Sequence, residues 1–311
     1  MDQVNIRKRL INGLLLGFLV FVFILIINSF VLAFEWLKTP FLGRFLEPSM
    51  LVNSAPIYNQ HENDAYPEIE YRKWFQLIEI NHQRVDVGKS FNELLSSDPL
   101  SKPVAIRFRD QEGTNFDYSV MLYRLPFVNQ ILYFYLPFII GWTYFISSLI
   151  LLKDQLLNGQ KSGYLIFFGA TAIVLCSFFD LITSHQIYPI WIAAFVFSSA
   201  GLFHIAIQEV FKSRYFNSVI GFGYFLAFVT AFFTWIKPYG IDSPIQFLSY
   251  IYWALLFFEC VFFTSFFVMI FAILKNGLPN ERKRFLILFG ISILSFGPIL
   301  VWIFLYLFGL T

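Results

Sequence analysis

Long apolar runs, each bounded by polar or charged residues, dominate the pattern of this sequence. A run of about 20 apolar residues crosses the roughly 30 Å hydrocarbon core of a bilayer as a helix. The runs predict seven transmembrane helices, over residues 10–34, 127–152, 163–184, 189–211, 216–236, 247–274 and 285–309. The first follows the basic Arg7, Lys8 and Arg9 and is longer than the apolar core of a signal peptide. We therefore interpret it as an uncleaved signal-anchor helix.

Between the first and second runs lies a polar segment, residues 38–126, whose second half has the patterns of strands. Alternating apolar residues predict strands at Phe75–Ile80 and Pro103–Asp110, with a hairpin partner over residues 115–123. Ser90 and Glu93 have the spacing of a capping box, which predicts a short helix to about residue 97. The first third of the segment has little periodicity and is predicted to be loop.

The predicted elements divide the chain into three parts. Residues 1–37 form a basic N-terminus and anchor helix, residues 38–126 a small α+β domain, and residues 127–311 a six-helix transmembrane domain. The fold class is thus a polytopic α-helical membrane protein of seven spans, whose stable partner is the lipid bilayer.

The positions of Lys and Arg predict the orientation. With the N-terminus inside the cell, the inner loops hold eleven Lys and Arg, whereas the short outer loops hold only Lys237. Cytoplasmic loops carry such an excess. The bias predicts a cytoplasmic N-terminus, with residues 38–126 and the C-terminus outside. Residue 311 would then lie on the wrong side for a cytoplasmic output domain, so the signal passes to a partner or the chain lacks a further span and output domain.

Composition and charge narrow the function further. The chain is 58% hydrophobic and only 14% charged, unlike a soluble domain, and its formal net charge of +2 gives no reason to expect nucleic-acid binding. The two Cys and four His residues lack metal-site spacing, and no P-loop, H-E-x-x-H or serine-protease motif is present. We expect no metal, no cofactor and no enzymatic activity.

Ionisable groups within predicted spans are costly and are therefore candidate functional residues. Glu259 lies near the middle of the sixth span and His204 lies at a similar predicted depth in the fourth. The two could pair as a proton-sensitive switch or relay, or could simply fix helix packing. Asp180, close to the outer end of the third span, fits a capping or solvated role better than a ligand role.

Aromatic residues gather toward the predicted outer ends of the spans. Such rings favour the headgroup level of a bilayer, and they could alternatively line a cavity that opens outward. The candidate rim comprises Trp191, Trp235, Trp253, Trp302, Tyr188 and Tyr250.

Residues 77–85, with the sequence LIEINHQRV, resemble a strand and turn of PDZ domains. Residues 91–95 resemble the helix that follows in that family, and residues 104–109 resemble its next strand. The resemblance implies a PDZ-like outer domain that captures a peptide or protein by strand addition. A structural β-domain without a peptide ligand is the alternative.

The order of anchor helix, outer domain and multi-span block resembles the membrane sensor regions of bacterial histidine kinases and SpoIIE-type phosphatases. Residues 201–207, GLFHIAI, are similar to a helix of those regions. The resemblance implies a non-enzymatic sensor or scaffold of the bacterial inner membrane that relays an outer signal to a membrane or cytoplasmic partner. The alternative is a small proton-coupled transporter that uses Glu259 and His204.

Overall fold

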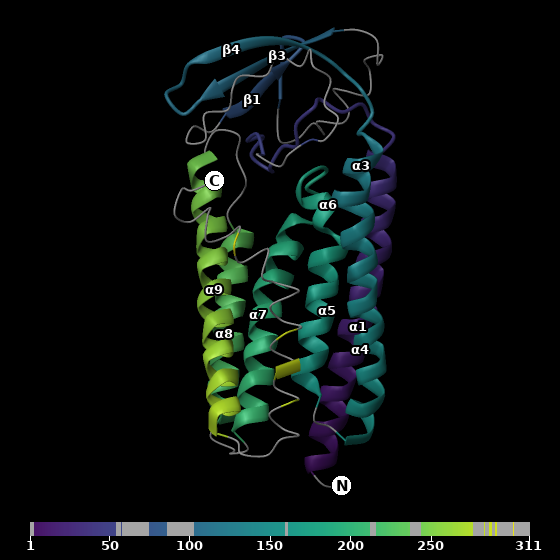
Figure 1. Ribbon diagram of the computed structural model, residues 1–311, viewed down its shortest axis with the longest axis vertical. Coiled ribbons are helices and arrows are strands. Elements are labelled where there is room, and N and C mark those ends of the chain that lie inside the picture. Colours follow the sequence, from purple (N-terminus) through teal and green to yellow (C-terminus); the bar gives the residue numbers. More distant parts are fainter. Residues whose placement is uncertain are drawn as a thin grey trace.

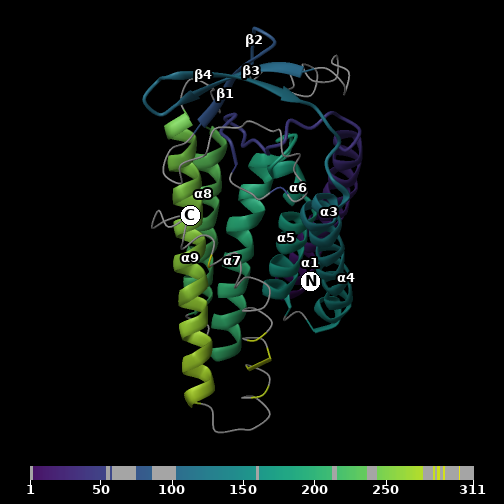
Figure 2. The same ribbon diagram turned by 45° about the horizontal axis from the view of Figure 1, so that its top comes forward.

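The computed structural model of the protein describes residues 3–53, 57, 75–85, 103–158, 161–211, 216–236 and 244–275, with residues 283, 286, 287, 290 and 301. Upright helices form a bundle, and a small antiparallel sheet lies across one end of it (Figure 1). We call this the sheet end of the bundle and the opposite end the far end. Tilting the molecule shows the same sheet spread over the helix ends (Figure 2).

The helices have the lengths and composition that the apolar runs predict, with one clear exception. In chain order they are α1 (Gln3–Trp36), α3 (Phe127–Gln130), the π-helix η1 (Ile131–Tyr135), α4 (Leu136–Asn158), α5 (Ser162–Cys176), α6 (Phe178–Leu181), α7 (Tyr188–Val210), α8 (Phe216–Ile236) and α9 (Pro244–Lys275). Five apolar stretches among the described residues are long enough to cross a membrane.

The exception is the predicted span 163–184, which is not one continuous helix. Helix α5 ends at Cys176, and Ser177, with φ −103° and ψ 11°, separates it from the four-residue α6. Carbonyls of Ile173 and Phe179 accept the hydroxyls of Ser177 and Thr183, so side chains occupy the backbone acceptors where the helix breaks. The seventh predicted span lies almost wholly outside the described residues.

Close backbone contact explains how the helices pack. Helix α5 lies against α1, α4 and α7, and α7 in turn packs on α8 and α9. A Cβ added at Gly201 would lie 2.7 Å from the backbone nitrogen of Phe167, so only glycine lets α7 approach α5 this closely. Ser198 and Ala194, one and two turns away, are also buried, as expected of small residues in a helix contact.

The sheet confirms the predicted strands. Its order is β2-β1-β3-β4, all antiparallel, with β1 at Phe75–Ile80, β2 at Gln83–Arg84, β3 at Pro103–Asp110 and β4 at Asn115–Met121. Asn81 and His82 form the β1–β2 turn with positive φ. The alternation of β3 sends Val104, Ile106 and Phe108 into a core. The helix predicted from Ser90 lies outside the described residues.

Candidate functional site

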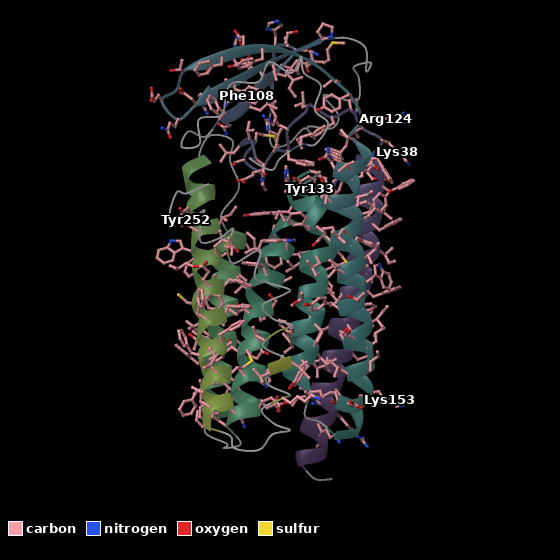
Figure 3. The ribbon with its side chains drawn as sticks, in the orientation of Figure 1. Lys38, Phe108, Arg124, Tyr133, Lys153 and Tyr252 are labelled. Carbon is pink, nitrogen blue, oxygen red and sulfur yellow. The ribbon has the colours of Figure 1, made fainter. Side chains whose placement is uncertain are left out.

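A short segment between the sheet and the helices is buried from both sides. We call residues 41–53 the junction segment. Predicted as loop, it is held by three isolated β-bridges, Phe41 to Tyr123, Leu46 to Val52 and Leu51 to Gln76. In Figure 3, Phe108 lies in the sheet above it and Tyr133 at the top of the helices below it. A charge pattern in the sequence does not identify such a segment, because the side chains that anchor it are ordinary apolar residues.

One set of side chains of the junction segment completes the core of the sheet. Leu42, Leu46 and Met50 are buried in one cluster with residues of all the long strands, among them Leu77 and Phe108. Backbone bonds fix this contact, since the amide of Leu77 donates to Met50 (2.9 Å). The sheet core is therefore incomplete without the junction segment.

A second set of side chains belongs to the core of the helices. Phe41 and Phe45 are buried with Trp36 of α1 and Phe179 of α6. Trp36 meets the Phe179 ring edge-on at 5.2 Å between centroids, and Phe41 and Phe45 lie 5.3 Å apart. Edge-to-face aromatic pairs add about 0.5–1.5 kcal/mol beyond the area they bury. Leu51 joins a further cluster with Tyr188 and Ile192 of α7.

A histidine provides a polar contact between the junction segment and the helices. His185 lies between α6 and α7, and its Nε2 is 2.7 Å from the carbonyl oxygen of Leu46. Because a carbonyl only accepts, Nε2 donates this bond. Burial lowers the pKa of His185 to about 4, although the bond to Leu46 acts in the opposite direction. The ring is therefore neutral at neutral pH.

Asp180 holds the loop that carries His185, which agrees with the predicted capping role. Its carboxylate accepts the hydroxyl of Ser184 and the amides of Gln186 (3.2 Å) and Ile187 (2.9 Å). Those amides precede α7, where backbone donors lack partners within the helix. Asp180 is only 2% exposed, so it is a buried carboxylate satisfied by its own loop.

Glu47 is the functional candidate that sequence reasoning missed. One carboxyl oxygen accepts the Asn53 amide at 3.3 Å, while Oε2 is buried without a hydrogen-bond partner among the described residues. Burial raises the pKa of Glu47 to about 7, and the bond from Asn53 only partly opposes this. The available signal was a carboxyl within the otherwise apolar run Phe45-Leu46-Glu47-Pro48.

The structure does not bring Glu259 and His204 together. His204 Nδ1 lies 3.0 Å from the hydroxyl of Tyr224 on α8, whereas Glu259 Oε1 is buried with no hydrogen-bond partner in the described part of the chain. Phe258, next to Glu259 in α9, stacks on Phe195 of α7 at 4.1 Å between ring centroids, and Phe195 precedes His204 by nine residues. At about 1.5 Å per residue, Glu259 and His204 therefore lie at different depths in the bundle.

The aromatic rim separates into core and surface residues. Tyr188 is almost fully buried, and Trp191 donates its indole N–H to Val174 and stacks on Phe195 at 5.1 Å. Trp235 and Trp253 are about two-thirds exposed on the bundle surface, as expected for an interfacial belt. Trp302 and the side chain of Tyr250 lie outside what the structure describes.

The far end of the bundle has polar contacts of its own. Tyr164 of α5 donates to Glu209 of α7 at 2.8 Å, and the ammonium of Lys161 lies 4.7 Å from the centre of the Tyr164 ring. Gln155 of α4 accepts the Lys161 amide. These contacts join three helices where the bundle is farthest from the sheet.

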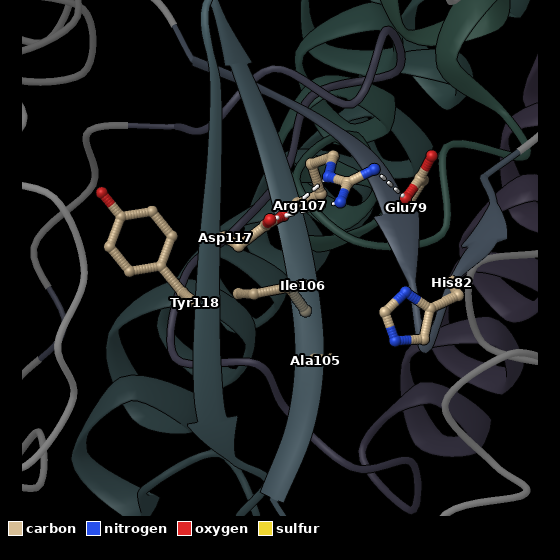
Figure 4. Close-up of a pocket in the computed structure, with 7 residues that line it drawn as sticks. All are labelled: Glu79, His82, Ala105, Ile106, Arg107, Asp117 and Tyr118. Carbon is tan, nitrogen blue, oxygen red and sulfur yellow. Dashed lines mark hydrogen bonds and ion pairs between the residues drawn. The ribbon is translucent and has the colours of Figure 1, made fainter.

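A shallow pocket of about 120 Å³ marks the outward face of the sheet (Figure 4). Arg107 is one of the residues that line it and bridges Glu79 (2.8 Å) and Asp117 (2.6 Å). The Arg107 bond is the main cause of a lowered pKa at Asp117. Because both carboxylates already bind Arg107, the pocket offers a compensated ion-pair network rather than a free charge. Among the described residues no group of His, Cys, Asp and Glu could hold a metal ion.

Comparisons with protein-family models, curated proteins and solved structures give no match.

Proposed function

We propose that the protein is a non-enzymatic membrane sensor or scaffold that relays events at its sheet domain through the helix bundle to a partner protein. The observation that carries the proposal is the junction segment, whose side chains are shared between two cores. A displaced sheet would shift Leu46 and Leu51 together, and with them His185 and the start of α7. Packed interfaces of this kind change between discrete arrangements rather than deform continuously.

The proposal includes the finer topology predicted from the sequence. Seven spans, a cytoplasmic N-terminus and an outer sheet domain agree with the bias of basic residues and with five apolar helices of sufficient length. We place the protein in a bacterial inner membrane. The order of strand, turn and hairpin in β1–β4 supports a PDZ-like domain that binds an outer peptide or protein.

The relay can be tested by breaking the junction and observing the far end. Leu51→Asp places a charge among Tyr188 and Ile192, and the full chain in lipid nanodiscs is followed by hydrogen–deuterium exchange. We expect faster exchange around Tyr164 and Glu209 in the variant. Exchange there that is identical to the wild type would overturn the relay. Phe225→Ala, a change on the exposed face of α8, serves as the control.

Transport is the competing function, and one observation favours it: Glu259 Oε1 is buried and has no hydrogen-bond partner within the described ranges. A proton carrier using this group would acidify pyranine-filled liposomes under an imposed proton gradient and would lose that flux in Glu259→Gln. A sensor gives no flux above empty liposomes in either form. Flux that depends on Glu259 would therefore replace the sensor proposal.

A further inference from the structure

The turn of the junction segment contains a carboxyl without a counter-ion among its described partners. The amide of Glu47 donates to Leu51 (2.8 Å), and Met50, with φ 61°, closes the turn. Buried hydroxyl Oγ of Ser49, in the same turn, also has no hydrogen-bond partner among the described residues. A buried carboxylate with a single amide donor is costly, whereas a protonated carboxyl there is tolerated.

The groups around this turn determine how it responds to protons. Arg44 precedes Glu47 on the same segment, and β1 presents the neutral Gln76, whose amide donates to the Ser49 carbonyl at 2.9 Å. The guanidinium of Arg109 on β3 donates to Oε1 of Gln76 (2.7 Å) rather than to Glu47. The loop before α7 presents His185, with Asp180 behind it engaged by its own loop.

We propose that the junction is a proton-operated latch, closed when Glu47 carries a proton and His185 is neutral. Ionisation of Glu47 leaves a charge in the turn that ties the sheet to α7, so the turn opens to hydrate it. Protonation of His185 places a cation in the buried contact with the Leu46 carbonyl. Each step transfers one proton between a side chain and water, and no other bond is made. The inference rests on the proposed relay only for its effect at the far end.

The two groups oppose each other, and this determines the expected pH profile. The Glu47 pKa is raised from 4.5 to about 7, so its contribution to closure is complete below 4.5 and is lost as pH rises toward 7. The His185 pKa is lowered from 6.5 to about 4, so its contribution is complete above 6.5 and is lost as pH falls toward 4. Between pH 4.5 and pH 6.5 the two contributions to closure change in opposite directions. Closure of the wild-type junction should therefore depend little on pH in this range.

Single variants separate the two effects, and the readout is hydrogen exchange of the junction amides in full-length protein in nanodiscs. In His185→Gln, which keeps a donor for Leu46, we expect protection of the Leu77 and Asn53 amides to fall by more than about tenfold from pH 5 to pH 7. In Glu47→Gln, which mimics the protonated acid, protection should rise by a similar factor over that interval. In the double variant, protection of these amides should stay constant from pH 5 to pH 7.

Glu112→Gln is the matched control, because Glu112 is an exposed carboxyl at the β3–β4 turn. It should reproduce the wild-type profile. A His185→Gln profile that is level from pH 5 to pH 7, or one that Glu47→Gln does not reverse, overturns the latch. If the junction titrates as expected while far-end exchange around Tyr164 stays constant, the latch stands and the proposed relay fails. The reverse pattern leaves the relay and removes the latch.

Discussion

Two regions of the described chain hold a buried carboxyl oxygen without a hydrogen-bond partner, at Glu259 and at Glu47, and they differ in what surrounds it. Glu259 lies in the middle of α9, next in sequence to Phe258, whose ring packs in the core of the helix bundle. Glu47 lies in a turn that contacts β1, the loop before α7 and the aromatic cluster around Trp36. Burial alone therefore does not identify the functional group. A buried carboxyl gains influence where its charge state changes a contact between two cores.

The largest effect should come from removing an aromatic anchor of the junction. Phe45→Ala deletes a ring that is 1% exposed between Phe41 and Tyr133, and large-to-small changes of this kind cost about 3–5 kcal/mol. Chemical unfolding of the purified protein measures the loss. Phe225→Ala, on a ring 59% exposed on α8, should cost far less. Equal losses would contradict a special role for the junction.

Next in size is the close approach of α5 and α7. Gly201→Val pushes a side chain against the backbone of Phe167, and overpacking costs about 1–3 kcal/mol. Gly221→Val on α8 meets nothing within 4 Å and serves as the matched control. We expect the melting temperature to fall for Gly201→Val only. Similar shifts in melting temperature for both variants would show that α5 and α7 tolerate being pushed apart.

The loop that carries His185 should depend on Asp180 to a comparable extent. Asp180→Ala removes the acceptor of the Gln186 and Ile187 amides, and a lost hydrogen bond to a charged group costs about 1.5–3 kcal/mol. Hydrogen exchange at those two amides should accelerate. Unchanged exchange would mean that other groups fix the loop.

The smallest effect concerns His204, which the sequence led us to pair with Glu259 and which instead contacts Tyr224. Tyr224→Phe removes the hydroxyl that lies 3.0 Å from His204 Nδ1, and interhelical hydrogen bonds in membranes average about 0.6 kcal/mol. The melting temperature should move only slightly. A large loss would give the His204–Tyr224 contact more than a packing role.

The sequence predicted the local elements well because their signals are local. The bounds of β1 and β3 follow from the alternation of apolar residues, and the turn at Asn81 and His82 lies within the strand-and-turn stretch that resembles a PDZ domain. The break at Ser177 was missed because α5, α6 and the residues between them form one apolar run. Hydropathy does not report side chains that bond to backbone carbonyls.

The candidate site was much less predictable, because it depends on contacts between distant residues. His185 bonds to Leu46, which is 139 residues away in the sequence, and Phe45 packs in the same buried cluster as Phe179. Helix depth alone paired Glu259 with His204, whereas the stacking of Phe258 on Phe195 places Glu259 at a different level of α7. Trp191 was grouped with Trp235 by depth, although one faces the core and the other the surface.

The central claim is that the junction segment holds the sheet and the bundle as one unit. Spin labels at Ser119 of β4 and Ser218 of α8, with Cys176 and Cys260 replaced by Ala, report this directly through pulsed electron–electron distance measurement in nanodiscs. We predict one narrow distance distribution that broadens in Leu51→Asp. A broad distribution in the otherwise native chain, or a narrow one that Leu51→Asp leaves unchanged, would contradict the account.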